Sequence, residues 1–150
     1  CPRSVFSIKK IITTYKQMKK IVENNNYDIV HCQSPIGGVV CRLACKKARK
    51  RGTKVIYTAH GFHFFKGSPL LNWIFYPIER FCSKYTDILI TINEEDYHRA
   101  SQFKAKKVVK IPSVGIDVKK YTDTIIDFND KRREFNIPSN AFVVLSVGEL

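Results

Sequence analysis

Short apolar runs alternate with longer segments of helical character along this chain of 150 residues, and this alternation limits the folds open to it. The runs lie at 28–32, 54–59, 87–92, 108–111 and 141–147. Short apolar runs bounded by turn residues are typical of buried parallel strands, because both faces of a parallel sheet are covered. The sequence therefore predicts an α/β protein built around a parallel sheet.

Helices are predicted between these strands. Ser34 and Pro35 form a start signal, because serine caps a helix N-terminus and proline fits its first turn. Gly52 is a matching stop signal. The predicted helices cover 5–23, the segment from Ser34 to Gly52, about 70–85, a segment that begins at Asn93, and a short piece near 131–135.

The faces of two helices carry specific expectations. In the second, a face of small residues should pack on the sheet, opposite a basic stripe. In the helix over 70–85, an apolar face should be core, and aromatic and basic residues should face outward. This outward face either resembles a membrane-interface belt or contacts a neighbouring loop. The basic stripe of the second helix is expected to consist of Arg42, Lys46, Arg49 and Lys50. In the helix over 70–85, the expected core face consists of Leu70, Leu71, Ile74, Phe75, Ile78, Phe81, Cys82 and Tyr85. The expected outward face of the same helix consists of Trp73, Tyr76, Arg80 and Lys84.

Composition narrows the choice of partners. The formal net charge of +13 indicates an anionic partner, which is nucleic acid, an anionic membrane or a phosphorylated substrate. Five cysteines scattered through predicted strands and helices favour a reduced, cytosolic compartment over a disulfide scaffold. No apolar run approaches the ~20 residues that a membrane-spanning helix needs.

The carboxyl ends of the strands are where an open parallel sheet binds its ligands. This rule selects the loops at 33–38, 60–67, 93–96 and 112–117, which should share one edge of the sheet. The second of these loops is rich in glycine and aromatic residues, and it begins with His60 and Gly61.

The segments at these loops resemble a known family. In order and spacing, 27–32, 58–64, 86–93 and 111–117 are similar to family-4 retaining glycosyltransferases of the bacterial exopolysaccharide and capsule type. The segment 58–64, which reads Thr-Ala-His-Gly-Phe-His-Phe, is fairly specific, and the ordered series is a strong signal.

The resemblance implies a partial GT-B fold, in which two Rossmann-like domains face each other across the active site. Residues 1–112 would be the acceptor-side domain without its first strands, 113–130 the connection, and 131–150 the start of the donor-side domain. The implied reaction moves a sugar from a UDP- or GDP-sugar to an undecaprenyl-diphosphate-linked saccharide, with retention, no metal and no other cofactor. We expect these 150 residues to be inactive alone, because the acceptor loop and the donor-binding Glu motif of the family are missing from them.

The resemblance also assigns roles to residues. His60 is expected at the reaction centre, as the catalytic residue. The helix that begins at Ser34 is a candidate anion site for the acceptor phosphate, although capping and packing explain these residues equally well. The expected substrate-binding residues are Ser34, Gly37, Gly38, Gly61, His63, Lys66 and Gly148.

A membrane-bound acceptor implies a protein at the membrane. We expect peripheral binding on the inner, cytoplasmic face of an anionic plasma membrane, through Lys9, Lys16 and Lys20 with contributions from Trp73 and Arg80. The alternative is a basic nucleic-acid-binding α/β module, which the charge alone permits. We expect no nucleic-acid partner, because the basic residues are spread over several helices and no known nucleic-acid-binding motif is present.

Overall fold

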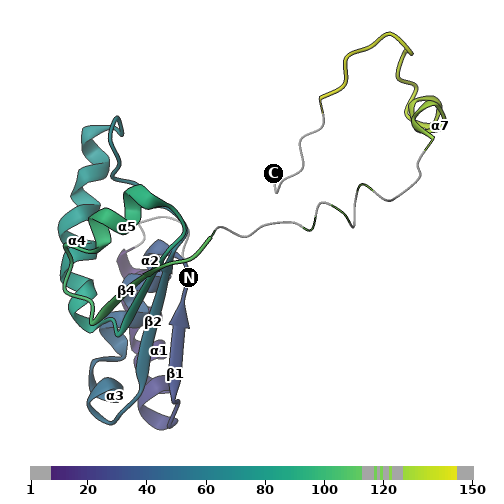
Figure 1. Ribbon diagram of the computed structural model, residues 1–150. Helices are drawn as coiled ribbons and strands as arrows, with labels where there is room; N and C mark the ends of the chain where they lie inside the picture. Colours follow the sequence, from purple (N-terminus) through teal and green to yellow (C-terminus); the bar gives the residue numbers. More distant parts are fainter. Residues whose placement is uncertain (1–7, 113–116, 118, 120–121, 123–126, 145–150) are drawn as a thin grey trace. The chain divides into compact units, whose positions relative to one another are not determined.

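Parallel strands form the centre of the fold. The computed structural model describes residues 8–112, 117, 119, 122 and 127–144. Within that part of the chain, β1 (Ile29–Cys32), β2 (Lys54–Ala59), β3 (Ile88–Thr91) and β4 (Lys107–Lys110) lie side by side in that order, all parallel (Figure 1). The predicted α/β, Rossmann-like parallel sheet is confirmed, and β2 has the predicted bounds.

Helices connect the strands as predicted, but two of the predicted helices, from Ser34 to Gly52 and over 70–85, are each divided into shorter pieces. Before β2 lie α1 (Ile8–Asn24), α2 (Pro35–Ala44) and α3 (Lys46–Lys50). Between β2 and β3, the predicted helix over 70–85 consists of η1 (Leu70–Ile74), α4 (Phe75–Cys82) and η2 (Ser83–Tyr85), of which η1 and η2 are 3₁₀ turns. Before β4 lies α5 (Glu94–Ala100).

The core includes residues of the sheet, of α2 and α3, and of the loop at 60–67, and part of it lies between one face of the sheet and α2. Along β2 and β3, Val55, Tyr57 and Leu89 are at most 2% exposed, because alternate strand residues point to this face. The predicted small-residue face of α2 and α3 is confirmed, since each of its members is buried. These members are Gly38, Cys41, Ala44, Cys45 and Ala48.

The predicted basic stripe is wrong for Arg42. Its side chain is fully buried, and the guanidinium lies 4.1 Å from the centre of the Tyr57 ring. Arg42 Nη2 donates to Glu79 Oε2 of α4 at 2.8 Å, and Arg42 Nε donates to the Gly38 carbonyl. A buried charge needs such partners, and the counter-charge comes from a helix 37 positions along the chain.

Arg49, from the same expected stripe, also forms an ion pair, with Asp87. Its Nε and Nη2 donate to the two carboxylate oxygens of Asp87 at 2.9 and 3.0 Å, a bidentate pair. Burial alone would raise the pKa of Asp87, but hydrogen bonds from Arg49, the Val55 N–H and Lys106 outweigh burial and lower that pKa below its usual range. These contacts tie α3 to β2 and β3.

The predicted orientation of the segment 70–85 is wrong in part. Cys82 is buried, and Trp73, Arg80 and Lys84 are exposed, as predicted. Leu70 and Leu71, expected in the core, are 88% and 78% exposed, whereas Tyr76, expected outside, packs against the core. Glu79 is buried against Arg42. The reason is the 3₁₀ turn η1: with about 3.0 residues per turn in place of 3.6, it changes the face on which each residue emerges.

The chain divides into two units, Cys1–Ser113 and Val114–Leu150, of which the second contributes α7 (Phe128–Glu134) near the helix predicted at 131–135. The Asp127 side chain caps α7 by accepting from the Asn129 and Asp130 N–H groups. Of the strand predicted at 141–147, residues 141–144 are not a strand, because no described segment pairs with them. The rest of it lies outside the described residues, and the assignment of 131–150 to a donor-side domain stays a prediction.

Candidate functional site

The carboxyl ends of β1 and β2 bring two polar side chains together. His60 directly follows β2 and Gln33 directly follows β1. Because the two strands are parallel neighbours, His60 Nε2 lies 3.1 Å from Gln33 Oε1, at hydrogen-bond distance. Because an amide oxygen can only accept, Nε2 is the donor in this bond, and in a neutral ring Nδ1 is then an acceptor. Both residues are exposed, so a ligand at this edge of the sheet can reach them.

The loop at 60–67 is fastened to the N-terminus of α5. The Phe62 N–H donates to Asp96 Oδ2 at 3.1 Å, and the Lys66 N–H donates to Glu95 Oε1 at 2.9 Å. Asn93 caps the helix by accepting from the Asp96 N–H. Two carboxylates at one helix N-terminus thus hold the loop that carries His60, and both also suit the positive end of the helix dipole.

Aromatic side chains anchor the same loop in the core. Phe62 and Phe64 are buried and stacked, with ring centroids 4.8 Å apart. His63, between them in sequence, is exposed and meets the Phe75 ring at 5.7 Å between centroids. Gly61 has a φ of 144°, a value that L side chains rarely adopt, so the turn after His60 requires glycine.

At the N-terminus of α2, packing accounts for one of the predicted binding residues. A Cβ on Gly38 would lie 2.7 Å from Cε2 of Tyr57, so close contact with that ring requires glycine. The Gly38 N–H donates to the Ser34 carbonyl, whereas the Ser34 side chain makes no cap hydrogen bond. Gly37 precedes Gly38 in the first turn, and an anion at this helix end would meet its N–H.

The structure places the remaining predicted residues as follows. The side chain of Lys66 is exposed on the fastened loop, next to the site. Lys9, Lys16 and Lys20 are exposed along α1, and Arg80 is exposed on α4. Gly148 lies outside the described residues. The binding and membrane roles of all these residues stay predictions.

Trp73 is exposed, as expected, and its ring also contacts neighbouring side chains. It is 40% exposed, and the Arg99 guanidinium lies 5.2 Å from the centre of its ring. The rings of Phe64 and Tyr76 also contact this indole, with 6.2 Å between ring centroids in each case. Part of the indole is therefore buried between α5 and the loop at 60–67, and the rest is exposed.

Comparison with known proteins identifies the chain. The family model described as glycosyl transferase 4-like matches residues 2–93. A Bacillus subtilis protein named as glycosyltransferase EpsD is 44% identical over 143 residues, which cover 93% of this chain and 38% of that protein. An Escherichia coli UDP-Gal:α-D-GlcNAc-diphosphoundecaprenol α-1,3-galactosyltransferase is 31% identical over 148 residues, covering 95% of this chain and 36% of the relative.

A third similar protein, of 41.2 kDa, is encoded in the cps region of Klebsiella pneumoniae and is 29% identical over 96 residues, covering 61% of this chain and 26% of the relative. The chain thus spans less than two fifths of the length of each of these relatives. The family inferred from the loop motifs is confirmed, and the matched residues 2–93 include both strand ends that form the site. The chain belongs to the glycosyl transferase 4-like family.

Proposed function

We propose that this chain is part of a glycosyltransferase that moves a sugar from a UDP- or GDP-sugar to a lipid-linked saccharide in surface polysaccharide synthesis. The observation that carries the proposal is the fixed histidine at the sheet edge, His60, held by Gln33 on a fastened loop. Family membership and the names of two relatives support it. They also favour it over the nucleic-acid alternative.

The proposed roles follow from the chemistry of the side chains. With Nε2 donating to Gln33, the Nδ1 atom of His60 is an acceptor that can orient a sugar hydroxyl. The N-terminus of α2 would contribute positive potential for an acceptor diphosphate, and Lys66 would add a charge. We propose a retaining reaction that needs no metal, in which charge on the leaving diphosphate is met by helix N-termini and cations.

The acceptor proposal rests on one relative, whose name specifies a diphosphoundecaprenol-linked acceptor. Such an acceptor is held in a membrane. Among the residues that the structure describes, no helix combines the length and apolar character needed to cross a membrane. We therefore propose peripheral binding to the inner face of the plasma membrane.

A transfer assay tests the proposal directly. The full-length protein is incubated with labelled UDP- and GDP-sugars and an undecaprenyl-diphosphate-linked saccharide, with and without EDTA. We expect a labelled lipid product whose anomeric configuration matches that of the donor, formed at the same rate in EDTA. Tight binding of DNA or RNA without transfer to any acceptor would support the nucleic-acid alternative and reject the proposal.

Gln33 provides a smaller, more specific prediction. Gln33→Leu in the full-length enzyme removes the acceptor for His60 Nε2, so the ring loses its fixed orientation. We expect turnover to fall about 10-fold, which corresponds to one hydrogen bond of about 1.4 kcal/mol. Gln33→Glu, which keeps an acceptor oxygen, should retain most of the turnover. Gln102→Leu, at an exposed position after α5, is the matched control, and equal losses in both leucine variants would contradict the assignment.

A further inference from the structure

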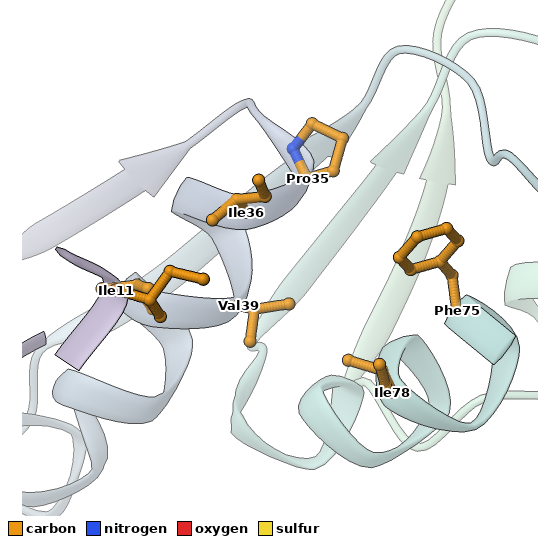
Figure 2. A pocket seen from close by; sticks show the side chains of 7 residues that line it. Ile11, Pro35, Ile36, Val39, Phe75 and Ile78 are labelled. Carbon is orange, nitrogen blue, oxygen red and sulfur yellow. The ribbon is translucent and has the colours of Figure 1, made fainter. Parts of the chain in front are cut away.

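An apolar groove lies between α1, α2 and α4. Its volume is about 190 Å³, and its lining includes no charged or hydrogen-bonding side chain. In Figure 2, Val39 of α2 points toward Ile78 of α4, and Phe75 faces the gap from the same helix. The lining residues are Ile11, Pro35, Ile36, Val39, Val40, Phe75 and Ile78.

Large apolar side chains are exposed on α1, which lines the groove, and on η1, which directly precedes α4. Leu70, Leu71 and Ile74 of η1 are the residues that the sequence pattern placed in the core, and Ile74 is 59% exposed. On α1, Ile8 and Ile12 are 66% and 49% exposed. We call these five residues the apolar rim. Ile12 directly follows the lining residue Ile11, and Ile74 directly precedes the lining residue Phe75. Exposed apolar side chains beside an apolar groove are typical of a site that meets a membrane or a partner protein.

The charges around the groove select between these occupants. The three helices that line the groove contain two acidic residues, Glu23 near the C-terminal end of α1 and Glu79 of α4, which is buried against Arg42. On α1 the lysines at 9, 16 and 20 follow next around the helix from Ile8 and Ile12, since each residue turns the helix by about 100°. A second copy of this chain would bring the same positive charge, and phosphates of a nucleic acid would not fill an apolar groove. Anionic lipid satisfies both the charged and the apolar surface.

We propose that the groove and the apolar rim enter the interface of an anionic bilayer, with a lipid hydrocarbon chain in the groove and the lysines of α1 at the lipid phosphates. This inference rests on the proposed function and deepens it. Pro35 lines the groove only two positions after Gln33, the partner of His60. A protein docked this way therefore holds its transfer site next to the surface in which a lipid-linked acceptor lies.

Docking of this kind has a salt-sensitive part and a salt-resistant part. Lysine contacts to lipid phosphates weaken as salt screens them, whereas burial of the apolar rim does not. The experiment is flotation of the full-length protein with vesicles of phosphatidylglycerol and phosphatidylcholine, at low salt and at about 1 M salt, where the screening length is about 3 Å. We expect binding at low salt and a measurable remainder at high salt.

Matched variants separate the two parts. Ile12→Ser with Ile74→Ser should lower the vesicle-bound fraction at high salt at least about 10-fold, and Lys9→Gln with Lys16→Gln should lower it mainly at low salt. The control is Ile21→Ser, an exposed isoleucine about half a helical turn away from Ile12 on α1. All variants are checked for unchanged unfolding midpoints.

Several outcomes would overturn the proposal. Wild-type binding at high salt by the Ile12→Ser, Ile74→Ser variant would show that the rim does not touch lipid. Self-association that the same variant abolishes would identify a second copy as the occupant, and a large loss of stability would place the rim inside the protein.

Sugar transfer to a water-soluble acceptor distinguishes the docking proposal from the proposed function, because variants of the apolar rim should retain this activity. If no transfer occurs but vesicle binding behaves as expected, only the proposed function fails.

Discussion

Replacing His60 with alanine in the full-length enzyme is expected to lower turnover at least about 100-fold, with little effect on folding. The loss is large because His60 is held at the edge of the sheet where the proposed reaction occurs, by Gln33 and by a fastened loop. The fold should tolerate the change, because the His60 side chain is exposed and contributes nothing to the core.

Initial rates of sugar transfer to the lipid-linked acceptor measure this effect, with circular dichroism to confirm folding. His98→Ala is the control: His98 is an exposed histidine of α5 whose Nε2 lies 3.9 Å from Glu94 Oε2, away from the strand ends. A folded His60→Ala protein that transfers sugar at a near-normal rate would remove His60 from the reaction centre.

Arg42→Met is expected to destabilise the protein by about 3–5 kcal/mol, a large part of the usual stability of a domain. The substitution leaves the Glu79 carboxylate buried between α2 and α4 without its charged partner. It also removes the cation from the face of the Tyr57 ring. Truncating one member of a buried pair costs far more than the pair itself contributes.

Urea unfolding of the full-length protein measures this loss. Adding Glu79→Met to Arg42→Met should recover much of the stability, because no unpaired charge then remains in the interior. Lys47→Met is the surface control, since Lys47 Nζ lies 3.8 Å from Glu23 Oε1 and its side chain is 69% exposed; it should change stability by less than about 1 kcal/mol. An Arg42→Met protein as stable as the Lys47→Met protein would contradict the prediction.

The sequence was sufficient to predict features that depend on neighbours along the chain. The bounds of β2, the small-residue face of α2 and the cap at Asn93 follow from local patterns, and all three are confirmed. The position of His60 could be predicted for a related reason: the carboxyl ends of parallel strands share one edge of a sheet, and His60 directly follows β2.

Features that depend on contacts distant in sequence were missed. The bond between Gln33 and His60 requires knowing that β1 and β2 are neighbours in the sheet. Burial of Arg42 requires the carboxylate of Glu79, which one helical pattern taken alone cannot reveal. The predicted positions of Leu70, Leu71 and Tyr76 were wrong because a single period was applied across a 3₁₀ turn and an α-helix.

The two carboxylates that fasten the loop at 60–67 also affect the thermodynamics of ligand recognition. Glu95 and Asp96 hold backbone N–H groups on both sides of His63, and Phe62 and Phe64 are packed beneath it. The loop therefore loses its conformational freedom when the protein folds and not when a ligand arrives. Such preorganisation removes an entropic penalty from binding, so a sugar that meets His60 meets a surface already in its final shape.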